Sequence, residues 1–150
     1  MARGPFRPPK LAWKVWNVFT RSHVLAYRLT GGRVGRTFRG GPVLLLDHVG
    51  RKSGERRTHP LLYLADGEDL VIVASKGGSH KHPAWWLNLR ERPNTTVQVG
   101  SEKRPVTAQL AHGEERARLW PRLVELYAPY ADYQTRTSRE IPVVVLRRSA

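Results

Sequence analysis

Six short runs of strand-forming residues, each followed by a turn or a loop, constrain most strongly what this chain can fold into. They span residues 42–49, 56–65, 70–75, 95–99, 104–111 and 141–147. Most are rich in Val, Leu and Ile, and turn-forming pairs such as Asp66-Gly67 separate them. Because closely spaced strands pair with their neighbours in antiparallel fashion, the pattern predicts a β-barrel rather than a parallel sheet with crossover helices.

Three helical segments interrupt the strands. Residues 10–29 follow Pro9 and place a basic stripe opposite an apolar face. Residues 83–92 begin with a proline, and residues 114–127 carry two glutamates in their first turn. We therefore expect a mainly β protein with an N-terminal helix and two further short helices. It should divide into a basic N-terminal arm and helix, residues 1–37, and a barrel domain, residues 38–150.

The chain is strongly basic. Its 150 residues include 26 Lys and Arg against 12 Asp and Glu, a net charge of +14, and nine basic residues precede the first acidic residue, Asp47. Such an excess suits an anionic partner, which could be nucleic acid, an anionic membrane surface or a polyanionic small molecule. No apolar run has the length of a signal-peptide core or a membrane span, so we expect a cytoplasmic protein.

Several kinds of enzyme have no support in the sequence. The chain contains no Cys, which excludes thiolate catalysis and Cys-based zinc sites. It also lacks a Walker loop, a Gly-x-Ser-x-Gly elbow and a His-Glu-x-x-His motif. His80 and His82 are the closest histidine pair, but no acidic residue lies near them in the sequence. We therefore expect neither a metal centre nor a hydrolase mechanism.

Two glycine turns and two aromatic groups could instead bind a flat, anionic molecule. The turn at residues 50–54 places two cations and a hydroxyl between glycines, where backbone N–H groups can also face an anion. The loop at residues 74–78 combines a hydroxyl, a cation and two glycines. Aromatic surface follows at Trp85, Trp86, Tyr127, Tyr130 and Tyr133. Taken singly, each feature is also consistent with an exposed turn, a flexible connection or core packing.

In this order and spacing, the motifs resemble the deazaflavin-dependent nitroreductase family, whose members use coenzyme F420. The likeness extends from about Phe38 to Arg147. It rests on five segments, residues 50–54 (GRKSG), 60–63 (PLLY), 74–78 (ASKGG), 83–89 (PAWWLNL) and 127–133 (YAPYADY). The resemblance implies a split β-barrel of the FMN-binding type and reduced F420 as the cofactor. A bound deazaflavin would also explain why no catalytic triad is present, because the cofactor itself carries out the hydride chemistry.

The resemblance implies roles for individual residues as well. The cofactor phosphate would be held by Arg51, Lys52 and Ser53. The deazaflavin ring would lie along Arg57, Thr58, His59, Pro60, Leu61 and Leu62. The ring and its ribityl chain would also follow Val73, Ala74, Ser75 and Lys76. The cofactor pocket would be completed by Ala84, Trp85, Trp86, Leu87, Asn88 and Tyr130. The acceptor side would be shaped by Tyr127, Tyr130 and Tyr133, and Ser75 would help to orient and protonate the acceptor.

The implied function is hydride transfer from F420H2 to an organic acceptor such as a quinone, an enone or a nitroaromatic compound. The basic excess agrees with this cofactor, because F420 carries a phosphodiester and an acidic oligoglutamate tail. One position departs from the family, whose nitroreductase-competent member has an aromatic residue where this chain has Leu62. Tyr63 should face the opposite side of the strand and cannot replace it. The resemblance therefore predicts cofactor binding but not nitroimidazole reduction.

The sequence leaves three other interpretations open. The same barrel could bind FMN instead of F420. The basic N-terminus could belong to a nucleic-acid-binding module, although it lacks the interleaved aromatic residues of a stacking platform, so we expect no specific nucleic-acid partner. The N-terminal helix, with Trp13, Trp16 and Phe19 among basic residues, could rest on the anionic inner face of the cell membrane or could cap the barrel.

Overall fold

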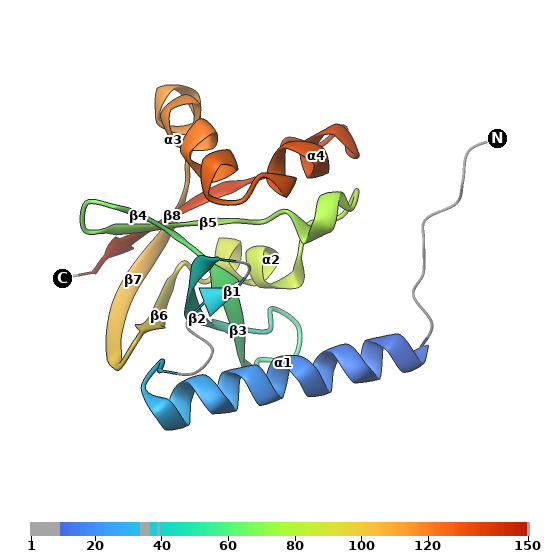
Figure 1. The fold of residues 1–150 in the computed structure, drawn as a ribbon, viewed down its shortest axis with the longest axis vertical. Coiled ribbons are helices and arrows are strands. Elements are labelled where there is room, and N and C mark those ends of the chain that lie inside the picture. The colour runs from blue at the N-terminus through green and yellow to red at the C-terminus, as the bar shows by residue number, and fades with distance from the viewer. Residues whose placement is uncertain (1–9, 34–36, 39, 150) are drawn as a thin grey trace.

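The computed structural model describes residues 10–33, 37–38 and 40–149 (Figure 1). Its elements are α1 (Lys10–Thr30), β1 (Thr37–Phe38), β2 (Gly41–Val49), β3 (Arg56–Leu62), β4 (Leu64–Asp66), β5 (Asp69–Val73), the 3-10 helix η1 (Lys76–Gly78), α2 (Ala84–Glu91), β6 (Asn94–Val99), β7 (Glu102–Leu110), α3 (Gly113–Leu126), α4 (Pro129–Thr135) and β8 (Val143–Arg148). Each predicted strand run overlaps at least one strand, and each predicted helical segment overlaps a helix.

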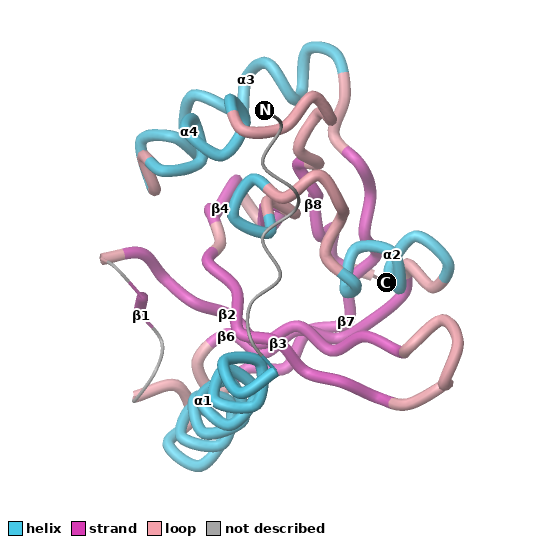
Figure 2. The backbone as a smooth tube through the Cα atoms, turned by 90° about the vertical axis from the view of Figure 1, so that its right-hand side faces the viewer, coloured by secondary structure: helices cyan, strands magenta, loops and turns pink. Residues whose placement is uncertain are grey.

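The strands form one antiparallel sheet in the order β1-β2-β6-β7-β8-β5-β4, with β3 paired to β2 outside this path. Figure 2 shows the sheet curled around a central space, with α1 beside β2 and β3 and with α3 and α4 at the opposite end. The apolar strand faces point into this space, where Leu44, Ile72, Trp86 and Leu146 belong to the largest core cluster. This arrangement confirms the predicted split β-barrel.

The run predicted as one strand over residues 56–65 is two strands, because the chain changes partner at Tyr63. β3 pairs with β2, whereas β4 pairs with β5. The Tyr63 N–H donates to the Pro42 carbonyl at 3.1 Å and anchors the break. Side chains still alternate as predicted, since Tyr63 packs on the main core while Leu62 packs on the cluster beneath α1.

The C-terminal half of α1 packs on the barrel. Val24 and Tyr27 are buried against residues of β2 in a small apolar cluster. The Tyr27 hydroxyl accepts the Gly100 N–H at 2.6 Å and donates to the Gln98 carbonyl at 3.3 Å. Capping of the barrel is therefore confirmed for the C-terminal half of the helix. The interpretation of Trp13, Trp16 and Phe19 as membrane contacts falls outside the residues whose side chains the structure describes.

α4 is a helix that the sequence analysis did not predict. It begins at Pro129, two residues after Tyr127 ends α3 in an extended conformation. A proline that ends one helix can occupy the first turn of the next, because that position needs no backbone N–H donor. The new helix carries Tyr130 and Tyr133 back toward the barrel.

Candidate functional site

A cavity of about 420 Å³ lies where α1, the β2–β3 pair, the loop after β5, the start of α2 and α4 meet. Apolar side chains make up much of its wall, among them Val43, Leu62 and Trp85. The polar groups come from few positions, including His59 and Ser75. Apolar walls with a few placed polar groups are typical of a site for a small organic molecule or a cofactor.

One side of the cavity is formed by the tyrosine cluster, which comprises Tyr127, Tyr130 and Tyr133. The Tyr127 and Tyr130 rings meet edge to face with centroids 4.9 Å apart, and the Tyr127 and Tyr133 hydroxyl oxygens lie 3.2 Å apart. Tyr130 is only 6% exposed, and its burial, followed by the neighbouring tyrosines, raises the pKa of its hydroxyl. The Tyr130 hydroxyl therefore stays protonated at neutral pH.

The Ser75 loop, residues 74–79, is held at the cavity by an unusual backbone. The φ angles of residues 76–78 are 44°, 62° and 79°, a left-handed run that glycine adopts easily and lysine rarely. The Arg139 guanidinium donates to the carbonyls of Ala74, Ser75 and Ser79 at 3.2, 2.8 and 2.8 Å. These three hydrogen bonds fix the position of Ser75 at the cavity wall.

The cationic turn, residues 50–54, connects β2 to β3. A 2.8 Å hydrogen bond from the backbone N–H of its last residue to the carbonyl of its first closes the turn. Asn88 of α2 accepts the backbone N–H of Arg51 at 3.0 Å and ties the turn to the barrel interior. Arg51 and Lys52 are exposed, and within the described part of the chain neither forms an ion pair. Both cations are thus available to an anion.

The chain matches the F420H2-dependent quinone reductase family over residues 19–148. It belongs to this family. A protein of Mycobacterium tuberculosis named as an F420H2-dependent quinone reductase is 45% identical over 132 residues, which are 85% of this chain and 89% of that protein. A second protein of that organism, named for the same activity, is 47% identical over 116 residues, which are 77% of this chain and 98% of that protein.

Solved structures agree with this assignment. A structure described as an F420-H2 dependent reductase is 43% identical, has a TM-score of 0.65, and covers 71% of this chain and 94% of its own. Another, described as a domain-swapped dimer, is 38% identical with a TM-score of 0.69 and covers 89% of this chain and 98% of its own. A Listeria innocua protein named as a pyridoxamine 5'-phosphate oxidase shares the fold at 18% identity and a TM-score of 0.52. The match covers 72% of this chain and 84% of that protein.

Membership in the quinone reductase family confirms the deazaflavin-dependent reductase that the motifs predict. The cofactor is F420H2, and the family description names a quinone as the acceptor. Of the interpretations left open by the sequence, the F420-dependent enzyme is therefore the one that holds, ahead of the FMN enzyme and the nucleic-acid-binding module.

The cavity of this family member brings together most of the residues predicted along the ring and at the acceptor. The predicted residues that line it are His59, Pro60, Leu61, Leu62, Val73, Ser75, Lys76, Ala84, Trp85, Tyr127, Tyr130 and Tyr133. They come from β3, the Ser75 loop, α2 and the tyrosine cluster, which are far apart in the sequence. The structure thus gathers the separate motifs around one space.

The remaining predicted residues lie outside the cavity lining. Arg51, Lys52 and Ser53 form the exposed cationic turn. Arg57 is exposed beside Glu55, and the Thr58 hydroxyl donates to Asp47 at 2.7 Å and accepts from Arg28 at 2.8 Å. Ala74 and Trp86 belong to the main core, Leu87 is half-buried on α2, and Asn88 is buried behind the cationic turn. In the structure these residues support the cavity from behind or stand at its exterior.

Several site residues were missed by the sequence analysis. The cavity is also lined by Thr20, His23 and Val43, which no motif indicated, and by Gly77 and Pro83, which lie in predicted motifs but were assigned no role. His48 lies buried behind His59, and Arg139 holds the Ser75 loop. Neither His48 nor Arg139 carries a local signal, because each acts on residues that are distant in the sequence. The sequence shows only that His48 and Asp47 interrupt an otherwise apolar run.

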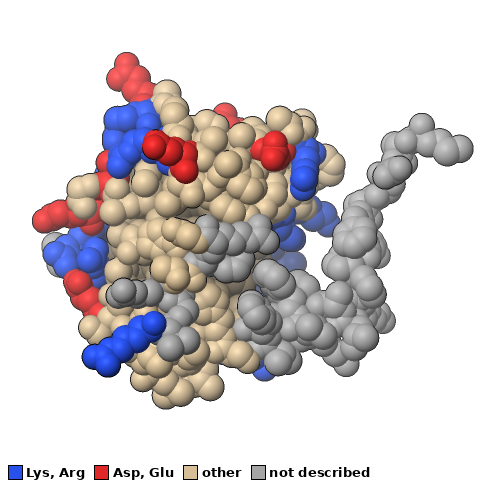
Figure 3. All heavy atoms as spheres, viewed as in Figure 1, with Lys and Arg blue, Asp and Glu red and all other residues tan. Residues whose placement is uncertain are grey.

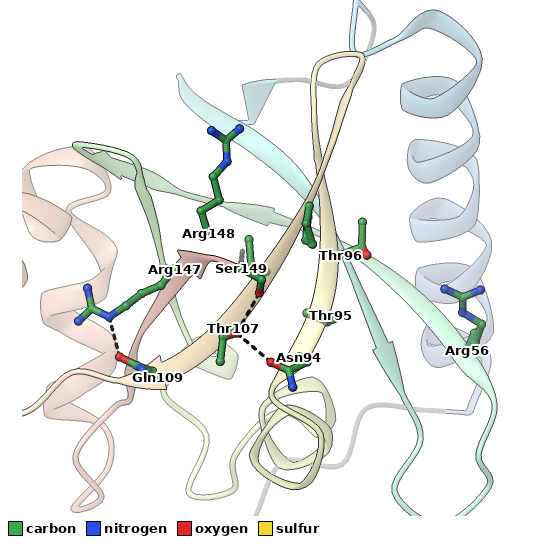
Figure 4. A pocket seen from close by; sticks show the side chains of 11 residues that line it. Arg56, Asn94, Thr95, Thr96, Thr107, Gln109, Arg147, Arg148 and Ser149 are labelled. Carbon is green, nitrogen blue, oxygen red and sulfur yellow. Dashed lines mark hydrogen bonds between the residues drawn. The ribbon is translucent and has the colours of Figure 1, made fainter.

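A second, more open groove of about 850 Å³ crosses β6, β7 and β8 (Figure 4). It is lined by polar residues such as Thr107, whose hydroxyl donates to Asn94 at 2.8 Å. Of its three arginines, Arg147 and Arg148 are engaged in ion pairs with acidic residues. None of the residues predicted for the site line this groove. We therefore place the site in the smaller cavity.

Proposed function

We propose that the cavity holds the deazaflavin ring of F420H2 together with a quinone, and that the cationic turn holds the cofactor phosphate. The observation that carries this proposal is the convergence on one cavity of β3, the Ser75 loop, the start of α2 and the tyrosine cluster. The residues fit the group, because the ring needs an apolar slot and the phosphate needs donors. Arg51 and Lys52 supply such donors, being exposed and without acidic partners among the described residues.

The protein's part in the reaction is binding, orientation and exclusion of water. When bound, F420H2 supplies the hydride. Pro60, Leu61 and Leu62 offer the ring an apolar wall, and Trp85 closes the pocket from α2. The tyrosine cluster orients the acceptor through its hydroxyls. The acceptor's proton comes from water, either directly or relayed through the Ser75 hydroxyl, since Tyr130 has a raised pKa and is a poor acid.

Quinones are the acceptors we propose first, with enones and nitroaromatic compounds as further candidates. Leu62 lines the cavity, where the nitroreductase-competent pattern has an aromatic ring, so we expect poor reduction of nitroimidazoles. Purified protein titrated with oxidised and reduced F420 tests cofactor binding. Oxidation of F420H2 in the presence of menadione, an enone or a nitroimidazole then ranks the acceptors. Absence of F420 binding at micromolar concentration would refute the proposal.

We further propose a cytoplasmic protein with peripheral contact to anionic membrane through α1. Among the described helices, none combines the length and the hydropathy that a membrane span requires. Leu25 and Leu29 support surface contact, because they are 58% and 77% exposed and lie one helical turn apart in line with Arg21. Flotation with anionic vesicles should recover the wild type and lose a Leu25→Gln, Leu29→Gln variant. Equal recovery of the two proteins would exclude this contact.

A further inference from the structure

A row of buried polar side chains leads from the cationic turn to the cavity wall. The Arg51 backbone N–H donates to Oδ1 of Asn88 at 3.0 Å, and Nδ2 of Asn88 lies 3.0 Å from Nδ1 of His48. Nε2 of His48 in turn lies 3.5 Å from Nδ1 of His59. Asn88 and His48 are only 4% and 3% exposed, whereas His59 lines the cavity. Of these side chains, His59 is the one that a molecule in the cavity would meet.

The β2–β3 ladder sets the two imidazoles against each other. His48 pairs with Arg57, and His59 lies two residues further along β3. The two histidines are therefore diagonal neighbours on the same face of the sheet, within reach of ring contact. Their ring centroids are 5.6 Å apart.

The chemistry of each group fixes the direction of every hydrogen bond in this row. A backbone N–H can only donate, so the atom of Asn88 beside Arg51 is its oxygen and the atom beside His48 is its NH2 group. The NH2 group also only donates, so Nδ1 of His48 must accept and carries no proton. A neutral His48 then has its proton on Nε2, which donates to Nδ1 of His59.

By the same rule a neutral His59 carries its proton on Nε2. Burial, followed by His59 and Arg57, lowers the pKa of His48 to about 4, although Asp47 acts in the opposite direction. Burial, followed by Arg57, also lowers the pKa of His59. Both rings are thus uncharged at neutral pH, and each carries a single ring proton.

We propose that Asn88 and His48 are positioning residues that hold His59 in its Nε2–H tautomer, so that His59 donates a hydrogen bond to a carbonyl oxygen of the molecule in the cavity. The neighbouring wall of β3 is apolar at Pro60, Leu61 and Leu62. A hydrogen bond from His59 would therefore fix how a molecule is oriented along this wall. Deazaflavins and quinones both carry carbonyl oxygens. The inference rests on the proposed use of the cavity, and the experiments below separate the two sources of the oxygen.

Long-range ¹H–¹⁵N spectra of the full-length protein with labelled histidine test the tautomers without any ligand. At neutral pH, His48 and His59 should both be neutral with the proton on Nε2. A proton on Nδ1 of either ring overturns the proposal. In Asn88→Asp the carboxylate can only accept, so Nδ1 of His48 should become protonated. If Nδ1 of His48 stays unprotonated in this variant, Asn88 does not set the direction of the hydrogen bonds in the row.

A matched pair of variants at His59 tests the donor itself. A glutamine amide can place an N–H near the position of Nε2, whereas an asparagine amide reaches only the position of Nδ1. His59→Asn should therefore weaken binding of the carbonyl partner about tenfold, and His59→Gln less than about threefold. The dissociation constant of oxidised F420 reports on the cofactor, and KM against kcat for menadione reports on the quinone. Equal behaviour of the two variants overturns the proposal.

His48→Phe keeps His59 but removes the group that orients it. We expect this variant to weaken the same partner that His59→Asn weakens, with a thermal midpoint that confirms folding. If His48→Phe binds this partner as well as the wild type does, His48 does not position His59 for the ligand and the proposal is overturned. If the wild type does not bind F420 at all, the proposed function fails, while the histidine spectra still decide the tautomers.

Discussion

At the scale of single residues, burial decides which titratable groups of the site carry charge. His48 lies 3% exposed on β2, and its surroundings lower its pKa to about 4. The pKa of His59 is lowered for similar reasons, and burial raises the pKa of the Tyr130 hydroxyl. Desolvation disfavours the charged form in all three cases. At neutral pH these side chains therefore present uncharged donors and acceptors to a ligand.

The buried histidine makes folding depend on pH. Unfolded His48 takes up a proton near pH 6.5, whereas folded His48 takes it up near pH 4. Between these values the unfolded state binds more protons, so the free energy of unfolding should fall as pH falls, by up to about 1.4 kcal/mol per pH unit. Urea unfolding followed by tryptophan fluorescence across this window measures the slope. His48→Phe should show a smaller slope, and an unchanged slope would contradict the assignment.

At the scale of elements, the Ser75 loop and α4 touch without room for a side chain between them. A Cβ added at Gly78 would lie 2.7 Å from the Tyr133 carbonyl oxygen, and the φ of Gly78 is +79°. Gly77 has a similar φ of +62°, but nothing lies within 4 Å of its added Cβ. The two glycines thus share a backbone requirement and differ in crowding, and Gly77 also lines the cavity.

This difference provides a matched test of the loop–helix contact. Gly77→Ala should cost about 1 kcal/mol of stability through its backbone conformation alone. Gly78→Ala adds overpacking against α4 and should cost about 2–4 kcal/mol. Chemical denaturation measures both costs, and stability rather than quinone reduction is the readout that compares the two variants, because Gly77 itself lines the cavity. Equal losses of stability in the two variants would show that α4 shifts to accommodate the added methyl group at no measurable cost.

Docking of α1 on the barrel rests partly on one phenol group. Tyr27→Phe removes the acceptor of the Gly100 N–H, a 2.6 Å hydrogen bond, and leaves that donor poorly satisfied. We expect a loss of about 1–3 kcal/mol in the free energy of unfolding, with F420 affinity retained because Tyr27 does not line the cavity. Denaturation and an F420 titration on the same preparation check both parts. If Tyr27→Phe has the same free energy of unfolding as the wild type, apolar packing alone holds α1 on the barrel.

Elements with strong local patterns could be predicted from the sequence, and elements set by distant partners could not. The apolar run of β2 and the Asp66-Gly67 turn each carry their own signal. The break at Tyr63 carries none, since it follows from β4 pairing with β5 instead of β2. The candidate site shows the same division. Glycine motifs located the cationic turn and the Ser75 loop, but Arg139 could be recognised only from the carbonyls it reaches more than 60 residues away.

At the scale of the whole molecule, the net charge of +14 is compensated unevenly. Acidic residues pair with arginines along the edge formed by β4, β8 and α3, where Figure 3 shows both signs side by side. Asp66, for example, lies between Arg118 and Arg122, which hold its pKa at about 2. The cationic turn has no such partners among the described residues. The cationic turn should therefore attract an anionic ligand more strongly than the edge formed by β4, β8 and α3, where the arginines are already paired.

Removing one charge at two different places separates local contact from overall attraction. Lys52 in the cationic turn and Lys103 on β7 are both exposed, and each alanine variant lowers the net charge by one. Lys52→Ala should weaken F420 binding about tenfold, as expected for one charge-assisted contact, and Lys103→Ala less than about twofold. Titrations from about 50 mM to about 500 mM salt should show a shallower salt dependence for Lys52→Ala, because the screened contact is already missing. If both variants lose affinity equally, the cofactor responds to the charge of the whole molecule and the turn has no special role.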